Sequence, residues 1–190
     1  MKFAPGSVGE TLTRMQGVWH DHIQLYQLNG DRLADDPWSG TPGPAPFENL
    51  VYIEFDGQHY RQSNITFRGR PLKTRSFAGI LTDGILHFSP LGPGDPTHVG
   101  VAAGPGRIIF SALKVTDAWQ NYAEPDFLQW LGPRQRTRTT ILYRHGIAVR
   151  TLFATGKQLS SDPTQRVSCD PRGREGPVHD TLQPTLVFDK

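Results

Sequence analysis

The chain has 190 residues, a length that fits a single all-β domain. Its 20 Lys and Arg residues nearly balance 18 Asp and Glu residues, so net charge gives no reason to expect a nucleic-acid partner, and the one cysteine, Cys169, excludes an internal disulfide. Hydrophobic residues reach only 36% although aromatics reach 10%, which indicates a folded domain with a polar or hollow interior.

One short helix is expected near the start of the chain. In 7–15, Ser7 can cap the helix and Glu10 follows three residues later, as in a capping box. The first strand is predicted at 18–28, ending at the turn Asn29-Gly30. The prolines between residues 31 and 49 exclude a central strand and predict a long loop.

Hairpins are predicted along the rest of the chain, because short alternating runs are separated by Asp-Gly, Gly-Pro-Gly or His-Gly. The paired ranges are 50–55 with 58–68, 72–81 with 85–89, 98–103 with 107–114, and 136–143 with 147–155. Residues 185–188 are a candidate last strand.

The segment 116–135 is predicted to be a connection with a helical turn at 125–131, since Pro125 suits the first position of a helix. Its aromatic residues either roof a ligand or form a satellite core under a loop. These residues are Trp119, Tyr122, Phe127 and Trp130.

Eight to ten strands, joined mostly by hairpins, predict an all-β fold: an antiparallel up-and-down β-barrel with a short N-terminal helix, formed by residues 1–190 as one domain. Closure into a barrel removes exposed sheet edges. A barrel of this size has room for side chains or for one small ligand.

The tripeptide Gly17-Val18-Trp19 at the start of strand one resembles the Gly-x-Trp signature of the lipocalins and their calycin relatives. The resemblance implies that Trp19 closes one end of the barrel, and that the long loop after strand one is similar to the lid of that family. It also implies that an arginine from a late strand covers Trp19. The candidates are Arg138, Arg144 and Arg150.

Strand one places Trp19 and Asp21 on one face, and His20 and His22 on the other. If Trp19 points inward, Asp21 is either a general base in a desolvated site or half of a structural Asp–Arg pair, and the second interpretation is preferred. The histidines either share a metal ion with a third ligand or lie at the surface. The surface interpretation is preferred, so no metal site is predicted.

Polar residues on both faces of 58–68 indicate an interior that holds a ligand, or else one solvated face. The predicted catalytic residues are Asp21, His22 and Arg138, which would move protons or stabilise developing negative charge. The residues predicted to bind substrate are Trp19, Tyr52, Tyr60, Asn64, Phe67 and Arg150.

Residues 1–9 lack a signal-peptide run, and no stretch reaches the roughly 18 apolar residues of a membrane span, so the chain is predicted to be cytoplasmic. No nucleotide-binding motif and no Gly-x-Ser-x-Gly elbow occurs, so no cofactor is predicted. The expected partner is a hydrophobic or aromatic small molecule. A homodimer is an option, and neither nucleic acid nor membrane is expected.

Three functions remain open. The first is a cofactor-independent isomerase, cyclase or lyase that acts on an apolar or aromatic substrate inside the barrel, with secondary metabolism as one setting. Bilin lyases are similar in fold class. The second is a non-catalytic carrier of a hydrophobic ligand. The third is a haem-binding barrel with a histidine as axial ligand.

Overall fold

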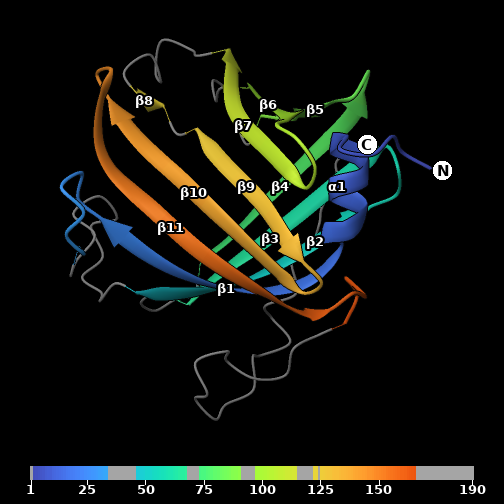
Figure 1. The fold of residues 1–190 in the computed structure, drawn as a ribbon, viewed down its shortest axis with the longest axis horizontal. Helices are drawn as coiled ribbons and strands as arrows, with labels where there is room; N and C mark the ends of the chain where they lie inside the picture. Colours follow the sequence, from blue (N-terminus) through green and yellow to red (C-terminus); the bar gives the residue numbers. More distant parts are fainter. Residues whose placement is uncertain are drawn as a thin grey trace.

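The computed structural model describes residues 2–33, 46–67, 73–90, 97–114, 122–123 and 125–165, which form an antiparallel β-barrel with one helix at one end (Figure 1). The elements are α1 (Val8–Met15), β1 (Gly17–Tyr26), β2 (Phe47–Phe55), β3 (His59–Phe67), β4 (Lys73–Thr82), β5 (Ile85–Phe88), β6 (Thr97–Ala102), β7 (Arg107–Lys114), β8 (Tyr122–Ala123), β9 (Asp126–Gly132), β10 (Gln135–Arg144) and β11 (Ile147–Ser160).

The strand β11 closes the barrel, because it pairs with β1 on one edge and with β10 on the other. Ten strands make the wall, and the two-residue β8 extends the β9 side of β10. The predicted up-and-down barrel is therefore confirmed. Within the described part of the chain, the long strands are paired on both edges, so closure protects their backbone groups.

The helix α1 forms where the capping residues predict it. Ser7 Oγ accepts a hydrogen bond from the Glu10 amide at 3.2 Å, and the Glu10 carboxylate accepts one from the Gly6 amide at 2.6 Å. The buried side of α1 carries Val8, Leu12 and Met15, which pack into the main apolar core. We call this end of the barrel the closed end. No helix in the described ranges has the length and apolarity to cross a membrane.

The two ends of the barrel differ in their connections. Short turns at 56–58, 83–84, 103–106 and 133–134 lie at the closed end. The turn at Asp83-Gly84 has φ values of 52° and 79°, the left-handed pair that an Asp-Gly hairpin turn requires. Except for the turn at His145-Gly146, the connections at the opposite end, which we call the mouth, are longer, and large parts of them lie outside the described residues.

The helical turn predicted at 125–131 is wrong, because Asp126–Gly132 is strand β9. It pairs with β7 on one side and β10 on the other, and this pairing prevails over the local helix signal. Pro125 precedes the strand, where its missing amide costs no ladder hydrogen bond. The described aromatics do not cluster: Phe127 lies on the outer face and is 45% exposed, whereas Trp130 packs against the core. Trp119, the side chain of Tyr122 and the candidate strand 185–188 lie outside the described residues.

Replacing Leu12 with alanine should lower the free energy of unfolding by about 2–5 kcal/mol, because the side chain is only 1% exposed and its removal leaves a cavity under α1. Chemical denaturation followed by circular dichroism measures the change. Thr13→Ala, on the exposed side of the same helix, should change stability by less than about 0.5 kcal/mol. Equal effects of the two substitutions would show that α1 does not close the barrel.

Candidate functional site

The inner face of the barrel changes from apolar to polar between the closed end and the mouth. Next to α1 the inward side chains are buried and mostly apolar. They include Trp19, Ile53, Tyr60, Leu86 and Ile108. The following inward positions of β1, β3, β9 and β10 carry Asp21, Gln62, Asp126 and Arg136. The lining of the interior therefore becomes polar where the apolar core ends, and we call the space on the mouth side of this boundary the chamber.

Asp21 and Arg136 form a buried ion pair across three strands. Asp21 on β1 lies opposite Gly156 on β11, and Gly156 lies opposite Arg136 on β10. The Arg136 Nη2 donates to both Asp21 oxygens at 3.0 and 2.8 Å, and Nε donates to Oδ1 at 3.2 Å. The two side chains are 5% and 3% exposed. Because both carboxylate oxygens are held by the guanidinium, the structure supports the Asp–Arg pair over a general base at Asp21.

Gly156 leaves the space that this pair occupies. A Cβ at position 156 would lie 2.7 Å from Arg136 Cγ and even closer to Asp21 Oδ1. The backbone of Gly156 does not adopt a left-handed conformation, so space alone requires glycine here.

Arg136 is also the arginine that covers Trp19. Its guanidinium carbon lies 4.5 Å from the centre of the indole ring, within cation–π range, and Trp19 Nε1 donates to the Met15 carbonyl at 2.8 Å. The assignment of this role to Arg138, Arg144 or Arg150 was wrong, because those positions lie further along β10 and β11 toward the mouth. Trp19 is completely buried, so it belongs to the core beneath the chamber.

Arg138 lies on the inner face, two residues nearer the mouth than Arg136. Its Nε lies 2.6 Å from Asp126 Oδ2, and Thr140 Oγ1 donates to Asp126 Oδ1 at 2.9 Å. The Arg138 and Asp126 side chains are 26% and 16% exposed. Since both point into a closed barrel, this residual exposure means that side chains do not fill the interior at this level.

A chain of hydrogen bonds lines the opposite wall on β3. Tyr60 donates its hydroxyl proton to Gln62 Oε1, and Gln62 Nε2 donates to Asn64 Oδ1 at 2.8 Å. Burial raises the pKa of Tyr60 above its usual range, which keeps the phenol protonated as a donor. The predicted residues Tyr60 and Asn64 therefore both face the interior, joined by Gln62, which the sequence prediction omitted.

His22 lies outside the barrel. Its side chain is 50% exposed, and Nδ1 lies 2.6 Å from one Glu48 oxygen, while His20 Nε2 lies 2.7 Å from the other. The alternation that brings Asp21 inside turns both histidines out, so His22 does not join Asp21 in a site. No group of three or more His, Cys, Asp or Glu side chains in the described ranges is arranged to hold a metal ion.

Tyr52 and Phe67 also lie on the outer face, in a cluster with Val18, Leu50 and Ile65. Their neighbours in sequence, Val51, Ile53 and Thr66, occupy the inner positions. Arg150 lies opposite the inward Leu142, near the mouth. Six of the nine predicted site residues therefore face the barrel interior: Trp19, Asp21, Tyr60, Asn64, Arg138 and Arg150.

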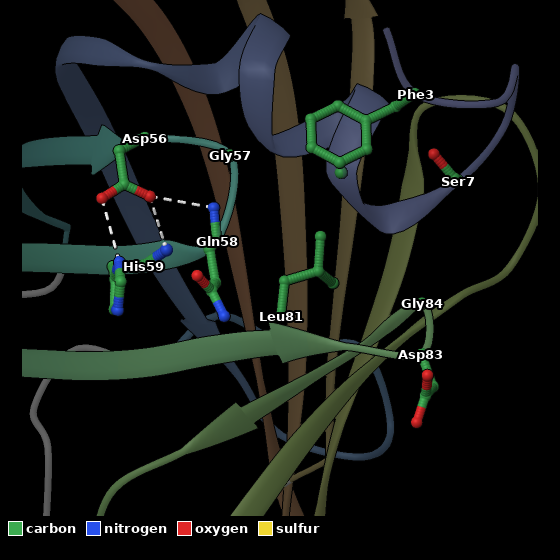
Figure 2. A pocket seen from close by; sticks show the side chains of 10 residues that line it. Phe3, Ser7, Asp56, Gly57, Gln58, His59, Leu81, Asp83 and Gly84 are labelled. Carbon is green, nitrogen blue, oxygen red and sulfur yellow. Dashed lines mark hydrogen bonds and ion pairs between the residues drawn. The ribbon is translucent and has the colours of Figure 1, made fainter. Parts of the chain in front are cut away.

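A hollow lies outside the barrel at the closed end, between the N-terminal segment and two hairpin turns (Figure 2). Phe3 and Leu81 face it, and Asp56 borders it. The Asp56 carboxylate accepts hydrogen bonds from the His59 and Gln58 amides, which lower its pKa to about 2. The Asp-Gly pair favours a type I′ turn at Asp56-Gly57, but the turn here is not of that type, because only Gly57 of the two has positive φ. This hollow shares no residue with the chamber.

No protein-family model and no curated protein matches this chain. Its fold is similar to a protein of unknown function from the DUF3598 family of Nostoc punctiforme PCC 73102, with 17% identity, a TM-score of 0.58, and coverage of 78% of this chain and 49% of that chain. It is also similar to the S-type phycobiliprotein lyase CPES from Guillardia theta, with 15% identity, a TM-score of 0.58, and coverage of 82% and 94%. The chain spans about half of the first protein. These likenesses show a shared barrel fold.

Arg136→Met should lower the free energy of unfolding by about 3–5 kcal/mol, because it leaves the buried Asp21 carboxylate without its partner. The double variant with Asp21→Asn should recover a large part of that loss, since the uncompensated charge is gone. Denaturation of the four proteins in this cycle measures the coupling. Arg61→Met removes the outer pair with Glu54, in which N and O are 3.9 Å apart, and should cost less than about 1 kcal/mol. Additive effects at positions 21 and 136 would contradict the pair.

Proposed function

We propose that this protein binds one small organic molecule, with an apolar body and an anionic group, inside the barrel between Asp21–Arg136 and the mouth. The observation that carries the proposal is the partial exposure of Arg138 and Asp126 on the inner face. Inward polar groups that still have accessible surface are what a ligand chamber requires, whereas a filled core would bury them.

The charges on the inner face favour an anionic ligand. Among the described residues, the strand register places four arginines and two aspartates inward. The arginines are Arg75, Arg136, Arg138 and Arg150, and the aspartates are Asp21 and Asp126. The excess of positive charge, in a space shielded by the barrel wall, attracts a carboxylate or a similar group.

Apolar side chains at the same level supply a surface for the body of the ligand. Phe77 lies opposite Gln62 on the inner face, and Leu152 lies opposite Thr140. Both are only half-buried, as is Phe110 on β7. An aromatic or extended hydrophobic molecule would cover these side chains while its acidic group meets Arg138.

A linear tetrapyrrole is the first ligand to test. The structurally similar protein from Guillardia theta is a phycobiliprotein lyase, and a bilin combines a long conjugated body with two carboxylates. The calycin relationship inferred from Gly17-Val18-Trp19 is part of this proposal, and the arginine that covers a closed-end tryptophan supports it. A cytoplasmic location and a homodimer remain predictions.

Conversion of the bound molecule, by an isomerase, cyclase or lyase, is the second candidate. Asp126 favours it, because this carboxylate is accessible from the chamber and lies between Arg138 and Thr140. It is better placed than Asp21 to take up a proton from a substrate.

Haem binding would depend on His98, the one described histidine whose register is inward.

Arg138→Met should weaken binding of biliverdin at least about tenfold, because it removes a charge-assisted contact to a carboxylate. Absorbance titration of the purified protein measures the dissociation constant. Arg107→Met, at an exposed outer position, is the matched control and should bind like the wild type. The dimethyl ester of biliverdin should bind weakly to the wild type and equally weakly to Arg138→Met. Equal affinity of wild type for acid and ester would refute the anionic ligand.

Asp126→Asn tests the second candidate. Binding of the ligand should stay the same or tighten, because Arg138 loses its negative neighbour, whereas conversion should fall about 100-fold or more. Mass spectrometry of the ligand after incubation measures conversion, and Asp31→Asn, at an exposed position, is the control. If the wild type leaves the bound ligand unchanged, the protein is a carrier and the second candidate fails.

A further inference from the structure

Four apolar side chains on the outer face of β1, β2 and β3 are almost completely buried. Val18 and Leu50 are 0% exposed, and Ile65 and Phe67 are 2% exposed. We call these four residues the outer cluster. Apolar residues on the outer face elsewhere are far more accessible, with Ile80 and Phe127 each 45% exposed. An outward position on this barrel therefore does not bury a side chain by itself.

The described elements do not account for this burial. Within the described ranges, β1, β2 and β3 contact their neighbours in the sheet, and α1 contacts β2. The helix packs on the inner side, with Val51 and Ile53 in the main core. Among the residues that the structure describes, Tyr52 is the one partly buried apolar residue packed against the outer cluster. These contacts leave the nearly complete burial of the outer cluster unexplained.

We propose that the C-terminal segment 166–190 docks on the outer cluster and covers it. The strand β11 ends beside the cluster, because Ser160 pairs with Val18 on β1. Three neighbouring strands span only about 10 Å in the sheet direction, whereas an extended chain covers about 3.3 Å per residue. The segment has ample length to cross the cluster from where β11 ends.

The composition of the segment fits this role. It contains Leu182 and the apolar run Leu186-Val187-Phe188. The segment 166–190 has four basic and four acidic residues, so no net charge opposes its docking on an apolar face. The loop segment 34–45 is the competing occupant, but Trp38 is its one large apolar residue.

Closure of the barrel limits where this apolar run can pack. Both edges of the long strands are paired in the described sheet, so the run has no long strand edge to join. The apolar run can therefore pack only against a face of the sheet, and the outer cluster is an apolar face of suitable size. Without such a cover the cluster would be an exposed apolar patch, which favours association between copies. The inference is independent of the ligand proposed for the barrel interior.

Proximity can be measured in the full-length chain, which has a single cysteine. A nitroxide on Lys190→Cys, in a Cys169→Ser background, should broaden the methyl signals of Leu50 and Ile65. It should leave Leu131 unaffected, because that residue lies on the outer face of β9 and is 53% exposed. No selective broadening of Leu50 and Ile65 would overturn the proposal. So would selective broadening by a nitroxide on Trp38→Cys alone, since the loop would then be the occupant.

A thermal double-mutant cycle gives the energetic counterpart. Leu186→Asp with Phe188→Asp should lower Tm by about 4 °C or more, and should lower it much less when Leu50→Ala is already present. Leu131→Ala is the control background, in which the full loss of Tm should persist. Equal losses in both backgrounds would contradict docking. A wild-type dimer that Leu50→Ala dissociates would also contradict it, since a second copy would then cover the cluster.

Discussion

The ion pair between Asp21 and Arg136 ties together the three strands at which the barrel closes. It reaches from β1 to β10 across β11, and Gly156 in the middle strand leaves the space for it. A slip of β11 by one residue would place Thr155 or Lys157 at this position and bring a side chain into the pair. A buried ion pair is weak evidence of net stability. Here the pair instead favours the observed register of β11, because only Gly156 leaves room for it.

The same pair divides the interior in two. Below it, Trp19 and the residues from α1 form an apolar core that reaches the closed end. Above it, Arg138 and Asp126 retain accessible surface, and the Gln62–Asn64 hydrogen bond continues the polar lining on β3. Because Arg136 neutralises Asp21 and covers Trp19, the groups left to contact a ligand are those nearer the mouth. The boundary between the apolar core and the polar lining is thus a consequence of how the barrel closes.

Local signals predicted much of this fold. Asp83-Gly84 and His145-Gly146 supply the left-handed φ values of two hairpin turns, and Ser7 with Glu10 marks the helix. The alternation along β1 correctly predicts that Trp19 and Asp21 both face the barrel interior. The partner of Asp21 could not be predicted, because it depends on the register of strands 115 positions apart in sequence. Strand β9 was missed because Pro125 mimics a helix start, and Tyr52 and Phe67 were misplaced because β2 and β3 carry apolar residues on both faces.

The central claim is that the ligand lies inside the barrel on the mouth side of Asp21–Arg136. Amide and methyl chemical shifts, followed by NMR during titration with biliverdin, test it most directly. The account predicts that the largest changes fall on inner-face residues of β3, β4 and β10, around Gln62, Phe77 and Arg138. Changes confined to the outer hollow around Phe3, Asp56 and Asp83, with the inner face unmoved, would contradict it.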